Sequence, residues 1–353
     1  MRGKFSGTVW MAQRHSSNNP YTRLFGDALE NKGCRVYDFR MRNLFKPRKG
    51  DIVHIHWLPD FYVSRNPVLL RFKSFLIFCY FFLFRILGIG TVWSVNNLFP
   101  HENLGEEREK IARKIISKGF SRLFVFGPES KNRVSSLFKV AAGKINIVPH
   151  GTYSGAYSRE VLYDLHRKYG FDPDTPLFVY FGLMRPYKGV EQLVEAFTTI
   201  DNANVLICGG GAGEYVELLH KKIRLSDRNN IAIEHRYISD EEIYTIFSQV
   251  DCVILPFQAI TMSGVLILAL TFRRPVITVN IGEMGYYIKH GQNGLLMNNN
   301  SPESIKTSVQ EFLLNQEGLK GSDDVENMIE WSSVAEQTVR NYYSCFFGTS
   351  NEQ

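Results

Sequence analysis

Short apolar runs alternate with segments of helical pattern along the whole sequence, and this alternation limits the fold more than any other feature. Segments with the spacing of amphipathic helices separate the runs, for example 21–32, which Gly33 closes as a C-cap. Strands that alternate with helices of about 10–15 residues are typical of βαβ units and a mainly parallel sheet. In the first half the predicted strands are 8–11, 51–56, 90–95, 122–126 and 145–148.

The pattern begins again after a turn-rich stretch between Pro149 and Pro173. A chain of 353 residues suits two domains of about 150–200 residues each. We therefore predict an α/β protein with two doubly wound, Rossmann-like domains, 1–160 and 161–330, whose main site lies in the cleft that they face, at the carboxyl ends of the strands. The second series of predicted strands is 177–181, 203–208, 231–234, 252–255 and 275–278.

The charge is divided unevenly between the two halves. Residues 1–150 contain 25 Lys and Arg against 10 Asp and Glu, a charge of +15, whereas residues 151–353 contain 16 against 25, a charge of −9. A basic half favours an anionic membrane surface, a nucleic acid or a phosphorylated substrate, and an unevenly charged solvated surface is the plain alternative. Because no recognised nucleic-acid module accompanies the charge, we expect no nucleic-acid partner.

The cysteines and the first residues bear on the cellular compartment. The five cysteines are widely spaced and form no C-x-x-C pair, which argues against a disulfide framework and a cysteine zinc site and favours a reducing compartment. Residues 1–17 lack the apolar run of a signal peptide. We therefore expect a cytoplasmic protein.

An uninterrupted apolar and aromatic run occupies residues 75–84. A spanning helix needs about 20 residues, and Arg71, Lys73 and Arg85 flank the run, so a transmembrane helix is not expected. Two alternatives stay open, a helix buried in the core and a helix at a membrane interface, and the surrounding charge favours the second. Other cations of this half that could meet anionic lipid are Arg40, Arg42, Lys46, Arg48 and Lys49.

The most specific motif is the segment 178–189, F-V-Y-F-G-L-M-R-P-Y-K-G. A strand ends at Phe181, a glycine turn follows, and two cations, Arg185 and Lys188, stand three residues apart before a helix. Arginine grips phosphate oxygens through two N–H groups, and lysine acts as a point charge. Such a pair would neutralise a departing diphosphate, although an ordinary loop with surface cations has the same composition.

This segment resembles the G-x-L-x-x-x-K-G phosphate-binding motif of GT-B glycosyltransferases, especially the large family four. The resemblance is good over about 175–310 and loose in the first half, and it implies a hexosyltransferase that uses a nucleotide sugar. It also implies that a helix in 331–353 crosses back to the first domain. Other segments occur in the order of that family, namely 148–151, 208–211, 237–242 with 251–256, and 290–294.

The resemblance also implies the donor-binding residues of the second domain. Gly210 belongs to a glycine turn for which a purely structural role stays open, because Glu214 breaks the G-x-G-x-x-G dinucleotide fingerprint. The family usually has two glutamates near Gly264, where this chain has Thr261 and Ala269. In the family the second of these glutamates normally binds the ribose of the donor. In this chain another residue must make that contact. The implied donor-binding residues are Arg185, Lys188, Gly182, Gly210, Tyr237, Ile238, Thr261, Ser263, Gly264 and Glu283.

In the first half, residues 92–102 resemble the H-N-x-x-P-H-E segment of some bacterial GT-B enzymes, with Asn96 in place of the first histidine. His101 near neutral pKa is a candidate to accept the proton of an acceptor hydroxyl, and Glu102 would orient a neighbour or act itself. A structural role for His101 stays open. His54 and His56 lie on one strand face without a visible third ligand, so packing is favoured over metal binding.

Together these features predict a transferase acting from a nucleotide-diphosphate sugar, UDP- in preference to GDP-, on a polyprenyl-diphosphate-linked saccharide acceptor in polysaccharide biosynthesis. The enzyme would be peripheral on the inner face of the cell membrane, with anionic lipid as a partner. No D-x-D triplet ends a strand, so neither a divalent metal nor any other cofactor is expected. The alternatives are a non-hydrolysing sugar-nucleotide epimerase and a catalytically silent glycosyltransferase-like subunit.

Overall fold

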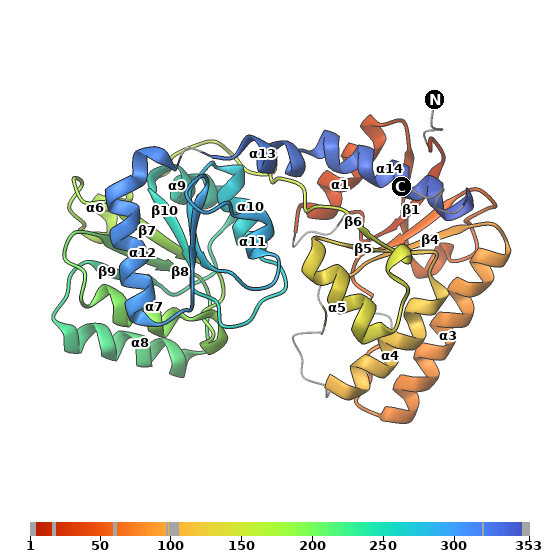
Figure 1. Cartoon of the computed structure of the whole chain (residues 1–353), viewed down its shortest axis with the longest axis horizontal. Coiled ribbons are helices and arrows are strands. Elements are labelled where there is room, and N and C mark those ends of the chain that lie inside the picture. The colour runs from red at the N-terminus through yellow and green to blue at the C-terminus, as the bar shows by residue number, and fades with distance from the viewer. Residues whose placement is uncertain are drawn as a thin grey trace. The chain divides into compact units, whose positions relative to one another are not determined.

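The computed structural model describes residues 5–15, 19–58, 62–96, 98, 106–319 and 321–347, with only the backbone described at Met41 and Glu106. The chain divides into two compact units. Unit 1 contains Met1–Gly151 and Met328–Gln353, and unit 2 contains Thr152–Asn327. Each unit is built on one six-stranded parallel sheet (Figure 1).

The sheet of unit 1 has the strand order β2-β1-β3-β4-β5-β6. Helices α3 and α4 pack together, as do α4 and α5, whereas α1 packs on the last helix, α14 (Figure 1). The strands are β1 (Thr8–Ala12), β2 (Arg35–Phe39), β3 (Ile52–Ile55), β4 (Gly90–Ser94), β5 (Arg122–Val125) and β6 (Ile145–Ile147). The helices of this unit are α1 (Tyr21–Asn31), α3 (Pro67–Ile86), α4 (Glu106–Gly119), α5 (Pro128–Phe138) and α14 (Trp331–Phe347).

The end of the chain is tied into the core of unit 1 by polar contacts of α14. The hydroxyl of Tyr342 lies 2.7 Å from Nδ1 of His54 on β3, and both side chains are fully buried. Arg122 on β5 donates from Nε to the Ser344 hydroxyl at 2.9 Å and from Nη2 to the Ser344 carbonyl at 2.8 Å. Helix α14 is therefore an integral part of the unit formed by the first 151 residues.

The sheet of unit 2 has the order β12-β11-β10-β7-β8-β9. Read from the other edge this is 3-2-1-4-5-6, the order of a Rossmann fold, with its switch point between β7 and β10. The strands are β7 (Leu177–Phe181), β8 (Asn204–Cys208), β9 (Ile231–Glu234), β10 (Cys252–Leu255), β11 (Val276–Val279) and β12 (Gly294–Met297). The helices are α6 (Leu165–Tyr169), α7 (Val190–Phe197), α8 (Gly213–Ser226), α9 (Asp240–Gln249), α10 (Gly264–Thr271), α11 (Met284–Tyr287) and α12 (Pro302–Asn315), and α13 (Asp323–Ile329) follows where unit 2 ends.

The predicted fold class, two doubly wound parallel α/β sheets, is confirmed. Strands β7, β9 and β10 have the predicted bounds. Two strands, β2 and β12, were not predicted, and both lie at the edge of their sheets. The R-V-Y-D-F sequence of β2 is largely exposed or half-buried, so a purely apolar signal misses it. Strand β12, with the sequence G-L-L-M, is mostly buried, so exposure does not explain why it was missed.

Candidate active site

The carboxyl ends of β7 and β10 meet at the switch point of the second sheet. The two strands are hydrogen-bonded neighbours, with Cys252 opposite Phe178. Their connections run to opposite sides of the sheet, which leaves a crevice outside the strand ends where ligands bind in folds of this type. The segments 182–189 after β7 and 256–264 after β10 therefore form the candidate site.

The loop after β7 is held in place by its backbone. Gly182 has a φ of +123°, which favours glycine. The amide of Met184 donates to the carbonyl of Gly210 at 2.7 Å, and the hydroxyl of the buried Tyr180 donates to the carbonyl of Leu183 at 2.8 Å. These bonds fix the loop immediately before Arg185.

The other end of this loop is docked on the exit of β10. Gly189 has a φ of +73°, and a Cβ placed there would lie 1.8 Å from the carbonyl oxygen of Pro256. The amide of Gln258 donates to the carbonyl of Tyr187 at 2.9 Å. The glycine after Lys188 is therefore required by the close approach of two backbones at the switch point.

Arg185 and Lys188 are two cations that have no counter-ion among the described residues. The described part of the chain offers neither side chain a hydrogen bond or an ion pair. The ammonium nitrogen of Lys188 instead lies 4.2 Å from the ring centroid of Phe257 and 5.6 Å from that of Tyr187. Burial, together with the charge of Arg185, lowers the pKa of Lys188 to about 8. Two uncompensated positive charges at a strand exit are suited to an anionic ligand.

The glycine turn after β8 separates into structural and open positions. A Cβ on Gly209, whose φ is +141°, would lie 2.1 Å from the carbonyl oxygen of Gly182. Gly211 has similar close neighbours in Val216 and Met184. At Gly210 the nearest atom to a Cβ would be the Leu183 side chain, at 3.4 Å. Gly209 and Gly211 thus serve the packing of the loops, and Gly210 alone of the three has room beside it.

Helix α10 begins next to the loop that follows β7. Ser263 caps the helix, and its hydroxyl accepts from the amide of Leu266 at 3.4 Å. A Cβ on Gly182 would lie 3.7 Å from the Val265 side chain, and Gly264 is exposed. The free amides of a helix N-terminus stabilise a bound anion.

The turn after β11 packs against the segment that precedes α10. Glu283 is fully buried, and its amide donates to the carbonyl of Thr261 at 2.9 Å. Gly282 has a φ of +54°, and a Cβ there would lie 2.4 Å from the carbonyl oxygen of Ile260. Thr261 is half-buried, whereas Ala269 is fully buried within α10. The structure therefore brings Thr261, Ser263 and Glu283 into neighbouring turns.

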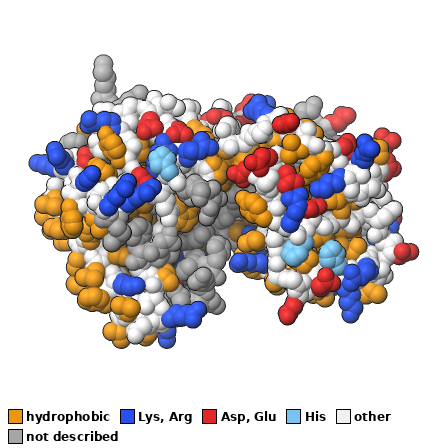
Figure 2. All heavy atoms as spheres, turned by 180° about the vertical axis from the view of Figure 1, so that it is seen from behind, with side chains coloured by type: hydrophobic (Ala, Val, Ile, Leu, Met, Phe, Trp, Pro, Cys, Tyr) orange, Lys and Arg blue, Asp and Glu red, His pale blue; other side chains and the backbone are white. Residues whose placement is uncertain are grey.

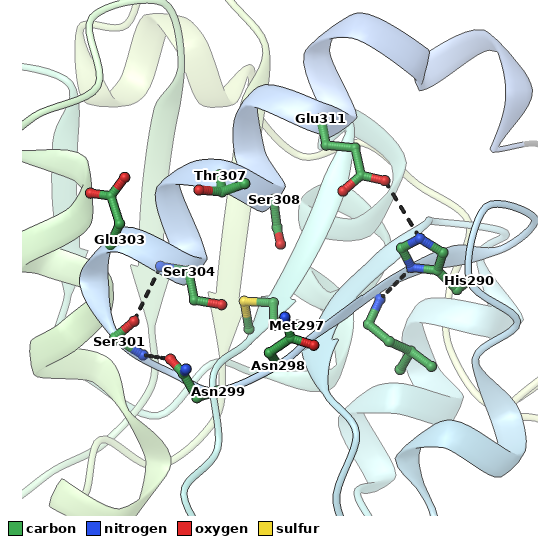
Figure 3. Close-up of a pocket in the computed structure, with 11 residues that line it drawn as sticks. His290, Met297, Asn298, Asn299, Ser301, Glu303, Ser304, Thr307, Ser308 and Glu311 are labelled. Carbon is green, nitrogen blue, oxygen red and sulfur yellow. Dashed lines mark hydrogen bonds and ion pairs between the residues drawn. The ribbon is translucent and has the colours of Figure 1, made fainter.

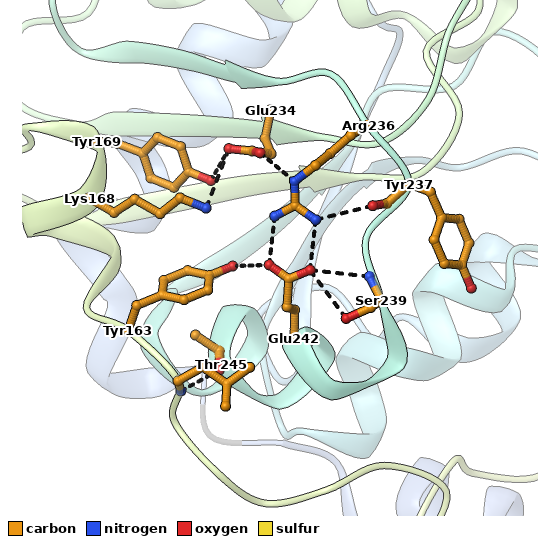
Figure 4. Close-up of polar contacts among 10 residues, drawn as sticks. Tyr163, Lys168, Tyr169, Glu234, Arg236, Tyr237, Ser239, Glu242 and Thr245 are labelled. Carbon is orange, nitrogen blue, oxygen red and sulfur yellow. Dashed lines mark hydrogen bonds and ion pairs between the residues drawn. The ribbon is translucent and has the colours of Figure 1, made fainter.

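The loop after β9 is held by a salt-bridge network centred on Arg236 (Figure 4). Its two terminal nitrogens donate to the carboxylate oxygens of Glu242 at 2.7 and 2.6 Å, and its Nε donates to Glu234 at 2.5 Å. Tyr163 and Tyr169 donate their hydroxyls to Glu242 and Glu234, each at 2.6 Å. Hydrogen bonding from Arg236, against the effect of burial, lowers the pKa of Glu242 to about 2.

The network fixes the backbone of the two residues that follow it. Arg236 also donates to the carbonyl of Tyr237 at 3.1 Å. The side chain of Tyr237 is 79% exposed, and Ile238 is buried. Figure 4 shows the ring of Tyr237 directed away from the salt-bridge network around Arg236, which we call the Arg236 clamp. This leaves a planar ring available for stacking on a rigid loop.

The candidate acid–base pair His101 and Glu102 lies outside the described residues. The neighbouring Asn96 is described, and its Oδ1 is buried without a hydrogen-bond partner among the described residues. The ring centroids of His54, on β3, and His56, immediately after this strand, lie 4.2 Å apart. Burial lowers the pKa of His56 to about 3, so the ring is neutral at physiological pH. His54, hydrogen-bonded to Tyr342 and Ser94, is a packed core residue.

A cavity of about 690 Å³ opens at the free edge of the second sheet, and its lining does not include Arg185 or Lys188. Figure 3 shows the residues that line it. His290 accepts from the amide of Leu296 at 3.1 Å through Nδ1, and its Nε2 lies 3.5 Å from a carboxylate oxygen of Glu311. The histidine thus covers an outward amide of edge strand β12. The lining residues are His290, Leu296, Met297, Asn298, Asn299, Ser301, Glu303, Ser304, Thr307, Ser308 and Glu311.

Several residues of the site were not predicted from the sequence. Phe257 supports Lys188, Tyr180 fixes the loop, and Arg236 clamps the 237–238 turn. Phe257 and Arg236 are each the second residue after a strand and Tyr180 is the next-to-last residue of one, and this position near the carboxyl end of a strand is the signal that could have found them. Among the described residues no group of three His, Cys, Asp or Glu side chains is placed to hold a metal ion.

Comparison with known proteins agrees with this geometry. Residues 164–330 match the family model of glycosyl transferases group 1. The chain is 26% identical over 270 residues to a GDP-mannose:glycolipid 4-beta-D-mannosyltransferase of Xanthomonas campestris, covering 74% of this chain and 70% of that protein. It is 22% identical over 243 residues to a D-inositol 3-phosphate glycosyltransferase of Rhodococcus jostii, covering 64% and 54%.

Solved structures share the whole fold. A sucrose-phosphate synthase from Thermosynechococcus elongatus has a TM-score of 0.71 at 16% identity and covers 98% of this chain and 100% of its own. Anabaena HepE in complex with UDP and glucose has a TM-score of 0.64 at 14% identity and covers 96% and 98%. With the Rossmann order of the second sheet, these similarities show a GT-B fold that carries a glycosyl transferases group 1 domain over residues 164–330, and they support glycosyltransferase activity.

Proposed function

We propose that this glycosyltransferase moves a hexose from a nucleoside-diphosphate sugar to a membrane-associated, polyprenyl-diphosphate-linked saccharide in polysaccharide biosynthesis. The observation that carries the donor assignment is the pair of uncompensated cations, Arg185 and Lys188, at the switch point of the second sheet. A diphosphate is the part of such a donor that needs two positive charges and several N–H donors.

In the transfer, the bond between the sugar carbon and the β-phosphate oxygen breaks, and a bond to the acceptor oxygen forms. Negative charge grows on the leaving diphosphate, and Arg185 and Lys188 would stabilise it, as would the free amides at the start of α10. The acceptor hydroxyl loses its proton to a base, for which His101 with Glu102 is our candidate. No step requires a metal or another cofactor.

The nucleoside would be bound on the rigid loops beside the cations. We assign the base to the Tyr237–Ile238 turn, since the exposed ring of Tyr237 can stack on it. Glu283, in the turn next to Thr261, is our candidate for the ribose or sugar hydroxyls. Gly182, Gly210 and Gly264 would allow close approach of the phosphates to the backbone.

A UDP-sugar is our first candidate for the donor, and a GDP-sugar is the second because one relative is named for GDP-mannose. The acceptor assignment is supported by the glycolipid in that name and by the +15 charge of residues 1–150. We place the enzyme in the cytoplasm, on the inner face of the cell membrane. An exposed apolar helix in unit 1 suits this placement.

Calorimetry with UDP and GDP tests the donor assignment directly. We expect one of the two to bind, and binding to weaken about 10-fold or more in Arg185→Ala, because each charge-assisted bond contributes about 1.5–3 kcal/mol. Arg224→Ala, on an exposed arginine of α8, is the matched control. If the protein binds neither nucleotide, the result favours the catalytically silent subunit. If it converts a nucleotide sugar without an acceptor, the result favours the epimerase.

A further inference from the structure

Helix α3 presents an apolar face to solvent as well as to the core. Its inner face buries Leu70, Ser74, Phe81 and Phe84. Its outward positions recur at helical spacing and are apolar, with eight large side chains between 42% and 75% exposed. We call this outward face the α3 surface; it consists of Val68, Leu69, Phe72, Phe75, Leu76, Cys79, Phe82, Leu83 and Ile86.

Such a helix is unusual in a protein surrounded by water. A helix that is apolar on all sides is expected in a core or in a membrane, yet only 22% of the most apolar window of α3 is buried. Figure 2 shows hydrophobic side chains gathered along one edge of unit 1, with Lys and Arg among them. An exposed apolar area of this kind marks a binding surface.

The helix passes the length and composition test for a membrane span, with 20 residues and a mean hydropathy of 1.7. Its place in the fold argues that it lies flat instead. Helix α3 connects the neighbouring parallel strands β3 and β4 and packs on α4. If it crossed a bilayer, Leu70, Phe81 and Phe84 would leave the core of unit 1.

The stretch of sequence that contains α3 carries cations and no carboxylates. No Asp or Glu occurs between residues 61 and 101, whereas α3 itself carries Arg71, Lys73 and Arg85. The hydroxyl of Tyr80 donates to the carbonyl of Leu44 at 2.6 Å, which holds the following basic segment, 45–49, against the helix. That segment carries Lys46, Arg48 and Lys49 and the 87% exposed ring of Phe45.

We propose that the α3 surface inserts into the headgroup and upper acyl region of an anionic lipid leaflet, with the helix axis parallel to the membrane. The phenylalanine rings would enter the apolar layer, and the flanking Lys and Arg would meet lipid phosphates. A second copy of the chain is a less suitable partner, because two such basic surfaces repel each other. The inference rests on the proposed membrane-linked acceptor, but it is measured without donor or acceptor.

Sedimentation with vesicles tests the inference. The full-length protein should bind vesicles of 3:1 phosphatidylcholine and phosphatidylglycerol at least 10-fold more tightly than pure phosphatidylcholine, and less tightly as salt rises. The double variant Phe75→Gln, Phe82→Gln should lose at least 10-fold in affinity. The matched control is Leu225→Gln with Leu314→Gln, which changes two exposed leucines of unit 2.

Cys79 offers a probe at the centre of the α3 surface. It is exposed, whereas Cys34, Cys208 and Cys252 are buried. An environment-sensitive fluorophore on Cys79 should shift to shorter wavelength with anionic vesicles, and a variant with Cys79→Ser and a labelled Leu225→Cys should not respond. The labelled protein with Cys345→Ser excludes signal from the half-buried Cys345.

Three results would overturn the inference. These are absence of binding to anionic vesicles, equal binding by the Phe75→Gln, Phe82→Gln variant, and a wild-type dimer in sedimentation velocity that this variant alone converts to a monomer. The last result would assign the α3 surface to a second copy. Because nucleotide binding by unit 2 is measured separately, loss of vesicle binding with intact UDP or GDP binding refutes this inference and leaves the donor assignment standing.

Discussion

The ammonium nitrogen of Lys188 lies 4.2 Å from the ring centroid of Phe257, the second residue after strand β10. A carboxylate in place of that ring would neutralise the lysine and compete with any bound phosphate. The aromatic face instead holds the cation by its quadrupole, an interaction of about 0.5–2 kcal/mol that leaves the charge available. The site thus keeps a positive charge oriented without cancelling it.

Replacing the cation should therefore reduce catalysis and leave folding intact. We expect Lys188→Met to lower kcat/KM by about 100-fold or more, the range seen when one donor to a developing negative charge is removed. Its free energy of unfolding should equal or exceed that of wild type, since a half-buried charge is lost. Lys289→Met, a lysine near Tyr286 after β11, is the control. Unchanged turnover in Lys188→Met would refute the phosphate assignment.

The lowered pKa of Lys188 makes nucleotide binding depend on pH. Because this pKa is about 8 in the free protein, the lysine loses its charge as the pH rises through 8. The affinity for UDP or GDP should then fall, by up to about 10-fold for each pH unit, until the pKa of the bound form is reached. Calorimetry from pH 6.5 to 9.5 measures this, and Lys188→Met should show a flat profile over the same range.

The lowered pKa of Lys188 affects folding stability in the direction opposite to its effect on nucleotide binding. Between pH 8 and the ordinary lysine pKa of 10.5, the unfolded chain keeps a proton that the folded chain has lost. The contribution of Lys188 to folding therefore becomes more favourable as the pH rises through this window. Between pH 8 and 10 the free energy of unfolding in urea should rise for wild type relative to Lys188→Met. A difference between the two proteins that stays constant over this range would argue against a lowered pKa of Lys188.

Gly189→Ala should destabilise unit 2 far more than an equivalent change at Gly170. Both glycines have left-handed φ angles, +73° and +71°, for which a side chain costs about 1–2 kcal/mol. Only at Gly189 would the new methyl group strike a backbone oxygen, at 1.8 Å, whereas no atom lies within 4 Å at Gly170. We expect a loss of about 3 kcal/mol or more against about 1 kcal/mol. Equal losses in denaturant unfolding would contradict the docking of this loop on β10.

The clamp around Arg236 should be sensitive to acid. Its partner Glu242 has a pKa lowered from the ordinary value of 4.5 to about 2, chiefly by the hydrogen bonds from Arg236. The stabilisation from the pair is complete above pH 4.5 and disappears as the pH falls through 2. Arg236→Met should thus unfold more easily than wild type at pH 6, with the difference shrinking below pH 4. Arg228→Met removes an exposed ion pair with Asp201 and should change stability by less than about 1 kcal/mol.

The Arg236 clamp also predicts that its variants change KM for the sugar donor more than kcat. Because Arg236 fixes the backbone of Tyr237, its loss should raise KM for the sugar donor more than it lowers kcat. Tyr237→Ala should give the same pattern without loss of stability, since the ring is 79% exposed. If either variant changed kcat alone, the assignment of the nucleoside base to this loop would be wrong.

The sequence supports some parts of this description better than others. Strand β7 and the G-x-x-R-x-x-K-G loop were predictable because a buried run and a glycine turn are local signals. The Arg236 clamp was not, since Tyr163 and Tyr169 join it from 79 and 65 residues away from their glutamate partners. For residues 75–84 the sequence left a core and an interfacial helix open, and only the arrangement of buried and exposed positions distinguishes the two faces of α3.

The buried contact between Tyr342 and His54 predicts where the end of the chain matters. The Tyr342 hydroxyl lies 2.7 Å from His54 Nδ1, across 288 residues of sequence. Tyr342→Phe leaves that buried nitrogen without its partner and should lower the stability of unit 1 by about 1–3 kcal/mol. Tyr343→Phe, at an exposed neighbour, should have little effect. Unfolding followed by a label on Cys79 reports on unit 1 and measures both.

Because α14 belongs to unit 1, this unit is completed only by residues from Met328 onward. During synthesis every strand of unit 2 has left the ribosome before Tyr342 and Ser344 can reach β3 and β5. Domains emerging from the ribosome generally fold as units. Unit 2 can therefore mature first, while unit 1, which carries the α3 surface, waits for α14 to be translated.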